Sequence, residues 1–262
     1  MASKPTIRVA VHGASGRVGQ EVLRAIDAAP DLELTASIDA HEPSWSPASL
    51  PHYISVVEAL SGRPADVIVD FSNASASLDM APVALAAGVR PVIGSTGFTP
   101  EQTSYLAAII DEHHLSGVLA PNFSIGAVLL LRLAAIAARY FDYADVAEEH
   151  HETKIDAPSG TAIALAHAIH EGHPERFHRN VPDREPLGGT RGGEYEGITL
   201  HSARLPGRMA HHQVTFGAPG QTLTLRHDTI NRECYMPGVL LAVRKVMTLD
   251  GLTVGLNSLL DL

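Results

Sequence analysis

The feature that most constrains the fold is a glycine-rich turn between an apolar run and an amphipathic run near the start of the chain. The apolar run spans residues 7–12, and glycines follow at positions 13, 16 and 19. Val18, Val22 and Ile26 then recur at helical spacing, so we expect a strand, a tight turn and a helix. Glycine at such a turn also lets the backbone approach a pyrophosphate closely.

The next stretch extends this pattern into a dinucleotide-binding unit. Residues 32–38 are expected to form a second strand, and the strand is followed by Asp39, twenty residues after Gly19. In the dinucleotide fingerprint, an acid at this place binds the ribose 2′-hydroxyl. We therefore predict that NADH or NADPH is bound by Asp39 and by the turn residues Gly13, Ala14, Ser15, Gly16, Arg17, Val18 and Gly19.

The choice between the two cofactors depends on charge. A carboxylate at position 39 would repel the 2′-phosphate of NADPH, so Asp39 favours NADH. Arg17, however, lies in the turn and is able to pair with that phosphate. We expect NADH to be favoured, with use of both cofactors.

The remainder of the first half alternates short apolar strands with helices. Strands are expected at 66–71, 91–93 and 117–120, with helices over 74–87 and from Pro100, and the Pro- and Ser-rich stretch 41–51 is expected to be a loop. Such alternation is typical of a doubly wound parallel sheet, so the fold class is α/β and Rossmann-like. Ligands bind outside the carboxyl ends of the strands in these sheets.

The second half has a different pattern. A helix is expected over 126–141, with an apolar side made of Leu129, Leu130, Leu133, Ile136, Ala137 and Tyr140, and a strand over 145–149. Residues 175–196 are polar and contain four glycines, and we expect them to be a mobile excursion. Alternating strands follow at 198–205, 210–216 and 221–228, so we expect a second α+β domain with a mixed or antiparallel sheet. A last helix begins near Pro237.

Residues 148–161 concentrate more polar chemistry than a core would contain. They include adjacent histidines at 150 and 151, Lys154, and a helix start at which Asp156 or Ser159 caps and Pro158 takes the first helical position. The first backbone N–H groups of a helix have no partner within it, so they form a seat for an anion. The alternative from spacing alone is an ordinary capped helix beside a solvated loop.

The order His-His-x-x-Lys-x-Asp-Ala-Pro-Ser-Gly-Thr-Ala at positions 150–162 resembles the signature of the dihydrodipicolinate reductase family. The resemblance implies hydride transfer from NADH or NADPH to a cyclic dicarboxylic imine or dienamine in the diaminopimelate route to lysine. For one substrate carboxylate we predict Ser159, Gly160 and Thr161, and for the other His151 with help from Lys154. His150 is the first candidate proton donor and Lys154 the second.

The resemblance extends to the loops that line the nicotinamide half of the cofactor. Asp-Phe-Ser, Gly-Ser-Thr-Gly and Ala-Pro-Asn-Phe match the loops of the family, although Ser95 stands where the family more often has threonine. Many family members accept both cofactors, and Ala40 here means that no basic residue directly follows the acid. The additional predicted cofactor residues are Phe71, Ser72, Gly94, Ser95, Thr96, Ala120, Pro121, Asn122, Phe123 and Arg232.

The resemblance also implies how the chain is divided and assembled. Residues 1–121 and 232–262 are expected to form the dinucleotide-binding domain, and residues 122–231 a domain for substrate binding and oligomerisation. Members of the family are generally tetramers built on the open sheet of the second domain, so we expect a homotetramer.

Composition limits the other partners. A formal net charge of −10 argues against nucleic acid or an anionic membrane surface as a partner. We expect a cytoplasmic protein, because no apolar run approaches the roughly 20 residues of a membrane span and the start has no signal-peptide core. Fifteen histidines invite a metal interpretation, but adjacent histidines on a strand point to opposite faces, so we expect no metal.

Three other functions stay open from the sequence. They are a related reductase of another small imino or oxo acid, a non-catalytic NADH sensor, and a metal-dependent hydrolase. Proton donors at His150 and Lys154 speak against the sensor, because a sensor has no need of them.

Overall fold

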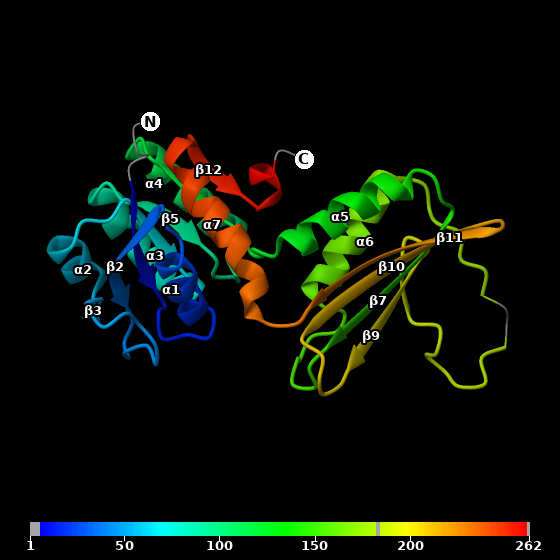
Figure 1. Ribbon diagram of the computed structural model, residues 1–262. Coiled ribbons are helices and arrows are strands. Elements are labelled where there is room, and N and C mark those ends of the chain that lie inside the picture. The colour runs from blue at the N-terminus through cyan, green and yellow to red at the C-terminus, as the bar shows by residue number, and fades with distance from the viewer. Residues whose placement is uncertain (1–5, 182–183, 261–262) are drawn as a thin grey trace. The chain divides into compact units, whose positions relative to one another are not determined.

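The computed structural model describes residues 6–181 and 184–260, which divide into two compact units. One unit ends at Ile125 and resumes at Arg232, and the other runs from Gly126 to Asn231. The colours of Figure 1 show this division, because the red C-terminal segment lies with the blue N-terminal strands. Residues 122–125 belong to the first unit, whereas the predicted boundary places them in the second.

The first unit contains a seven-stranded sheet in which every pair of neighbouring strands is parallel. Its strand order is β12-β6-β5-β4-β1-β2-β3, so the order reverses next to β1. Ligands in doubly wound sheets bind at this reversal. The strands are β1 (Ile7–His12), β2 (Leu32–Ile38), β3 (His52–Tyr53), β4 (Val67–Asp70), β5 (Arg90–Ile93), β6 (Ser116–Leu119) and β12 (Gly251–Val254).

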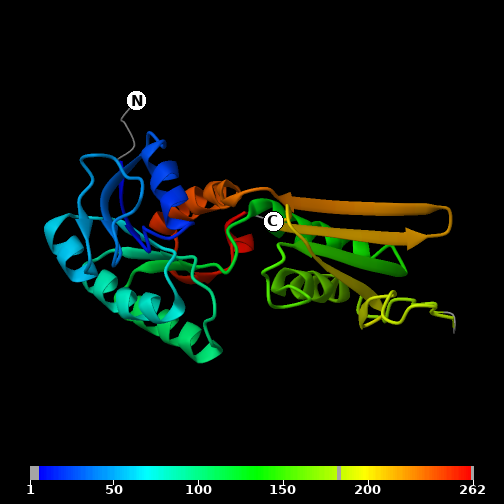
Figure 2. The same cartoon turned by 90° about the horizontal axis from the view of Figure 1, so that it is seen from below.

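Helices cover both faces of this sheet, as Figure 2 shows, with α1 and α7 on one face and α3 and α4 on the other. Caps fix where two of them begin. Asn73 accepts a hydrogen bond from Ala76 N–H at the start of α3, and Thr99 forms a capping box with Gln102 at the start of α4. The helices are α1 (Gly19–Asp27), α2 (Val56–Gly62), α3 (Ala74–Ala86), α4 (Pro100–Glu112) and α7 (Met236–Lys245), with 3-10 helices η1 (Arg232–Tyr235), η2 (Val246–Thr248) and η3 (Asn257–Leu259).

This architecture confirms the predicted Rossmann-like fold class, and β1 and β2 begin and end at the predicted residues. Several short elements of this unit were not anticipated, among them β3, α2 and β12. β3 has two residues and β12 has four, which is too short for a periodic pattern to stand out.

The second unit has a five-stranded mixed sheet of order β11-β10-β7-β9-β8. The neighbouring strands β7 and β9 are parallel and the other pairs are antiparallel, in agreement with the predicted mixed sheet. Helices α5 (Ile125–Ala138) and α6 (Gly160–Gly172) pack on one face of it (Figure 1). The strands are β7 (Tyr143–His150), β8 (Gly193–Tyr195), β9 (Ile198–Arg204), β10 (Ala210–Ala218) and β11 (Gln221–Thr229).

Part of the stretch 175–196 belongs to the sheet and the core of the second unit. It contributes the edge strand β8, and Phe177 within it is buried in the core of the unit. The backbone N–H of Phe177 donates to the carbonyl oxygen of Glu196, which closes the excursion at its base.

The predicted apolar side of α5 was largely wrong. Leu130, Ala134 and Ala138 are buried, whereas Leu129, Leu133, Ile136 and Tyr140 are exposed. The helix is apolar around most of its circumference, so periodicity did not identify the face that packs on the sheet.

No helix among residues 6–181 and 184–260 has the length and apolar character to cross a membrane.

Close packing of α5 and α6 gives a test of the second unit. A methyl group at Gly172 would clash with the carbonyl oxygen of Ala135, whereas one at Gly193 would meet nothing nearer than 3.9 Å. Gly172→Ala should therefore lower the free energy of unfolding by about 2 kcal/mol, and Gly193→Ala should change it little. Urea unfolding followed by circular dichroism measures both, and equal effects of the two changes would contradict this packing.

Candidate active site

The glycine turn of the first unit is held in a conformation that excludes side chains. Gly13 has a φ of +75°, and a Cβ there would lie 2.7 Å from the carbonyl carbon of Phe71. A Cβ on Gly19 would clash with the carbonyl oxygen of Gly13. The strand, turn and first helical residue are therefore packed as closely as a pyrophosphate-binding turn requires.

Asp39 is tied directly to this turn. Its Oδ2 accepts a hydrogen bond of 2.9 Å from the backbone N–H of Ser15. Partial burial would raise the pKa of Asp39, but hydrogen bonds from the backbone of Ser15, Ala40 and His41 outweigh it and lower the pKa. The side chain is thus an anion beside the turn, as a ribose-binding acid should be. Arg17 is exposed on the same turn.

The three predicted nicotinamide loops of this unit come together at the carboxyl ends of β4, β5 and β6. The rings of Phe71 and Phe123 lie with centroids 5.5 Å apart, and a Cβ on Gly94 would clash with the Phe71 ring. Backbone bonds continue the contact, because Gly94 N–H donates to the carbonyl of Asp70 at 2.8 Å and Ala120 N–H to that of Ile93 at 2.9 Å. These contacts, together with that of Gly13 with Phe71, join the loops after β1, β4, β5 and β6 to one another.

The predicted cofactor residues in the loops after β5 and β6 differ in their exposure and in their contacts. The Ser95 hydroxyl donates to the buried Asp70 carboxylate at 3.0 Å and so faces the interior, whereas Thr96 is exposed. Pro121 is exposed, and Asn122 Oδ1 accepts from Ser124 N–H at 2.8 Å in a local turn. Arg232 lies in η1, directly before α7.

In the second unit, the helix-facing side of the sheet changes from apolar to polar along β7. Ala144 and Val146 belong to the hydrophobic core, and Glu148 and His150 follow on the same face, where all four are buried. On β10 the same change leads from Phe216 and Val214 to His212, because β7 and β10 are antiparallel and His212 pairs with Glu148. The polar end of the face lies at the start of α6.

The Glu148 carboxylate is the centre of this polar end. Arg204 donates to both of its oxygens, from Nη2 to Oε1 at 2.8 Å and from Nη1 to Oε2 at 3.0 Å, and Ser159 N–H donates to Oε1 at 3.2 Å. Burial opposes ionisation, but hydrogen bonds from Arg204, Ser202 and His150 outweigh it and lower the pKa of Glu148 to about 2. At neutral pH this group is a buried, fully paired anion.

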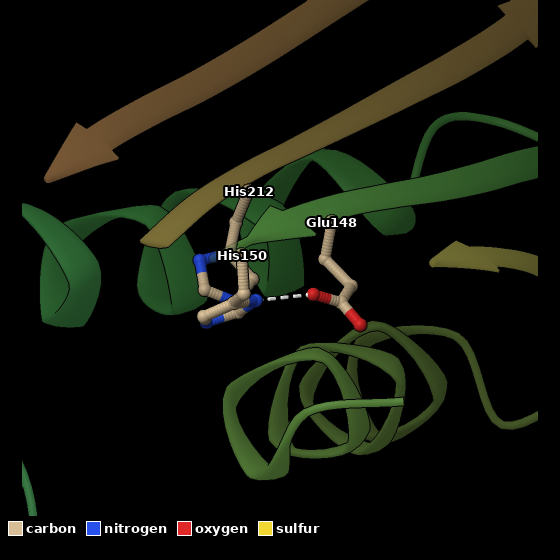
Figure 3. Close-up of side chains that lie close together, drawn as sticks. All are labelled: Glu148, His150 and His212. Carbon is tan, nitrogen blue, oxygen red and sulfur yellow. Dashed lines mark hydrogen bonds and ion pairs between the residues drawn. The ribbon is translucent and has the colours of Figure 1, made fainter. Parts of the chain in front are cut away.

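Two imidazoles meet beside that anion (Figure 3). His150 bonds through Nδ1 to Glu148 Oε2, and the rings of His150 and His212 lie edge to face with centroids 5.3 Å apart. Burial lowers the pKa of His150, although Glu148 opposes the shift, and burial together with the charge of His150 lowers the pKa of His212 to about 4. Because an ionised carboxylate only accepts, Nδ1 of His150 carries a proton.

The start of α6 confirms the predicted helix and one of its two candidate caps. Ser159 is the N-cap, and its hydroxyl oxygen accepts from Ala162 N–H at 3.2 Å and lies 3.1 Å from His212 Nε2. Pro158 precedes the cap, so its predicted place at the first helical position was wrong. The N–H groups of Gly160 and Thr161 make no hydrogen bond to any residue the structure describes, and Gly160 has open space around it.

The other predicted substrate residues lie on the exposed loop between β7 and α6. His151 bonds through Nδ1 to the hydroxyl of Thr153 at 2.7 Å, and Lys154 Nζ donates to Asp156 at 2.7 Å. The backbone oxygen of Asp156 also accepts a hydrogen bond of 2.6 Å from Arg204 Nη2. Asp156 therefore braces the loop, whereas His151 and the Lys154 ammonium remain near its surface.

Glu148, His150 and His212 also form a potential metal site, because their ligand atoms lie within 4.8 Å of one another. Each of these three side chains already has a hydrogen-bond partner in the protein, and the Arg204 guanidinium adds a positive charge against the carboxylate. The contacts favour a hydrogen-bonded network over a cation site.

Glu148, Arg204 and His212 are not among the residues that the sequence predicts for the site. Alternation alone would have placed Glu148 on the same strand face as His150, and His212 on the same face as Val214 and Phe216. Arg204 had no comparable signal, because its partnership with Glu148 follows from the parallel pairing of β7 with β9.

The fold and the glycine turn with its acid define a class of protein, the dinucleotide-dependent oxidoreductases with a Rossmann-like domain. Comparison with known families then gives the particular one. Residues 7–123 match the family described as dihydrodipicolinate reductase, N-terminus, and residues 126–260 match dihydrodipicolinate reductase, C-terminus. The chain belongs to the dihydrodipicolinate reductase family, whose members are NAD(P)H-dependent oxidoreductases.

Individual relatives agree over the full length. The 4-hydroxy-tetrahydrodipicolinate reductase of Dehalococcoides mccartyi is 43% identical, over 98% of this chain and 99% of that protein. The enzyme of the same name from Geobacillus kaustophilus is 41% identical, over 98% of this chain and all of that protein. A dipicolinate-bound dihydrodipicolinate reductase from Paenisporosarcina sp. TG-14 is similar in structure, with a TM-score of 0.88, 37% identity, and coverage of 97% and 100% of the two chains.

The ionised state of Glu148 gives a test by pH. The pKa of Glu148 is lowered from 4.5 to about 2 on folding, so its carboxylate stabilises the fold fully above pH 4.5 and progressively less as the pH falls toward 2. Glu148→Gln should therefore destabilise the protein more at about pH 7 than at about pH 3.5. Urea unfolding of both proteins at the two pH values measures this, and an equal loss at both would contradict the assigned ionisation.

Proposed function

We propose that this chain is a 4-hydroxy-tetrahydrodipicolinate reductase of lysine biosynthesis through diaminopimelate. It reduces the cyclic dicarboxylic substrate to tetrahydrodipicolinate, with loss of the 4-hydroxyl group as water. NADH or NADPH supplies the hydride, and the protein supplies a proton and binds the carboxylates. The observation that carries the proposal is the junction of β7 with α6, where His150, Lys154 and the open end of a helix occur together in the second unit.

The helix end is suited to one carboxylate of the substrate. Gly160 and Thr161 offer N–H groups at the positive end of α6, and the lack of a side chain on Gly160 leaves room for an anion. Ser159 supports this seat as the cap, because its hydroxyl and N–H groups are already engaged with His212 and Glu148. We therefore assign Ser159 to the site as the residue that positions the helix end. Its hydroxyl group does not itself bind the carboxylate.

The second carboxylate has cationic and polar partners on the loop that follows β7. Lys154 supplies a positive charge and is only partly exposed, with 23% of its side chain accessible. His151 is close along the chain and exposed. Two anionic groups on one small ring require such local charges, because the protein as a whole carries a net charge of −10.

His150 is the first candidate proton donor. In the free protein burial lowers its pKa, so the imidazole is mostly uncharged at neutral pH. Two substrate carboxylates would favour the protonated form and so charge the ring when it is needed. Nδ1 is held by Glu148, which leaves Nε2 as the atom that delivers the proton. Lys154 is the second candidate donor.

The cofactor preference, the oligomeric state and the location in the cell are part of the same proposal. NADH is the favoured cofactor, with NADPH also used, because Asp39 lies beside the glycine turn as an anion. The face of the second sheet that α5 and α6 leave open is the proposed surface for a homotetramer, and the proposed location is the cytoplasm. Dinucleotide-binding and substrate-binding roles are assigned to the first and the second unit.

A coupled assay tests the function. The product of dihydrodipicolinate synthase is supplied to the purified protein, and oxidation of NADH and of NADPH is followed separately at 340 nm. The proposal requires oxidation that depends on the synthase product. Oxidation only with another imino or oxo acid would indicate a related reductase, and binding of NADH without any oxidation would indicate a sensor.

Removal of either candidate proton donor should slow turnover without preventing cofactor binding. His150→Ala and Lys154→Ala are each expected to lower kcat by about 10² to 10⁴. NADH binding, measured by fluorescence titration, should stay within twofold of wild type. His113→Ala, at an exposed histidine after α4, is the control and should be fully active. If both donor variants keep turnover within threefold of wild type, the assignment is wrong.

The charge of Asp39 should set the cofactor preference. The wild-type protein is expected to have a lower KM for NADH than for NADPH. Asp39→Asn should reduce the ratio of the KM for NADPH to the KM for NADH roughly tenfold, which corresponds to about 1.4 kcal/mol. Steady-state kinetics with each cofactor measure this. Asp27→Asn, which removes an exposed carboxylate at the end of α1, is the matched control. An unchanged ratio in Asp39→Asn would contradict the role of this carboxylate.

A further inference from the structure

We propose that Asp70 is a positioning residue that holds three loops of the dinucleotide site in register through one buried carboxylate. Asp70 is the last residue of β4 and is completely buried. It lies next to Phe71 and Ser72, in the middle of the sheet, with β1 on one side and β5 on the other. The inference rests on the proposed function in so far as these loops bind NADH or NADPH.

The carboxylate of Asp70 accepts hydrogen bonds from four side chains. On Oδ1 these come from His12 Nδ1 at 2.8 Å and from the Ser72 hydroxyl at 2.6 Å, with Ser72 N–H at 3.1 Å. On Oδ2 they come from the hydroxyls of Ser77 and of Ser95, the latter at 3.0 Å. A carboxylate has about four acceptor sites, so its capacity is fully used.

These donors come from different parts of the first unit. His12 ends β1 immediately before the glycine turn, Ser72 follows β4, and Ser95 lies in the loop after β5. Ser77 belongs to α3 and is fully buried. One anion therefore fixes the spacing between the start of the pyrophosphate turn and two loops that are predicted to line the nicotinamide.

The charge of Asp70 makes this arrangement stronger than neutral contacts would be. Burial would raise its pKa, but hydrogen bonds from His12, Ser72 and Ser77 outweigh burial and lower the pKa. Hydrogen bonds to an ionised acceptor are roughly twice as strong as those between neutral groups. Loss of the anion would leave several buried donors without their partner, and the loops would separate or rearrange.

Asp66 provides a comparison in the same unit. It lies just before β4, at the opposite end of the strand from Asp70, and accepts hydrogen bonds from the backbone and the side chain of Arg8. Asp66 thus joins β1 to β4 as Asp70 does, but it is far along the strands from the glycine turn. A change at Asp66 alters stability without touching the loops.

The experiment compares Asp70→Asn with Asp66→Asn in the full chain. NADH and NADPH binding are measured by fluorescence titration without the second substrate, and thermal stability is measured in parallel. We expect Asp70→Asn to weaken binding of the preferred cofactor at least tenfold and Asp66→Asn to leave it within twofold, even if both lower Tm. Binding within twofold of wild type in Asp70→Asn, or an equal loss in Asp66→Asn, would overturn the proposal.

A second pair keeps the test valid if Asp70→Asn does not fold. Ser77→Ala removes one buried donor to Asp70 from a residue outside the predicted cofactor loops, and Ser116→Ala removes a buried hydroxyl that donates to the carbonyl of Val246. Ser77→Ala should weaken cofactor binding two- to fivefold and Ser116→Ala should not. Equal affinity for the cofactor in Ser77→Ala and Ser116→Ala would overturn the proposal.

The binding readout separates this proposal from the proposed function. If the protein binds NADH but does not reduce the ring, the reductase assignment fails and the comparison of the aspartate variants still decides the role of Asp70. A wild-type protein that binds neither dinucleotide would overturn both.

Discussion

The buried carboxylate of Glu148 is the interaction on which the polar end of the second unit depends. An ionised group without water is stable only when its lone pairs are satisfied. Glu148 obtains its donors from its own strand through His150, from the end of β9 through Arg204, and from the start of α6 through Ser159 N–H. One anion thus fixes the orientation of an imidazole and the position of a helix end, the two components to which the proposed function assigns the proton and a substrate carboxylate.

The first unit uses a buried carboxylate in a similar way. Asp70 ends a central strand and collects donors from the loops around it, whereas Asp39 lies nearer the surface and bonds the glycine turn. In both units the anion is at the carboxyl end of a strand, where the backbone leaves the sheet and its direction must be fixed by side chains. Loops carry the predicted binding residues, and buried ions on the sheets hold those loops in place.

The sequence predicted those parts of the fold and site that local pattern determines. The glycine turn, β1, β2 and the start of α6 follow from residues close together in the chain. The partners of Glu148 were not predictable in this way, because Arg204 is 56 residues away and reaches it only through strand pairing. The uniform apolar character of α5 likewise concealed which of its faces packs on the sheet.

The hydrogen bond to Glu148 determines which nitrogen of His150 carries the proton, and nitrogen NMR tests this most directly. In protein labelled with ¹⁵N-histidine, a His150→Gln variant identifies the His150 signals. The account predicts a proton on Nδ1, an unprotonated Nε2 at neutral pH, and a pKa below the ordinary 6.5. A His150 ring that carries its proton on Nε2 with Nδ1 bare would contradict the account.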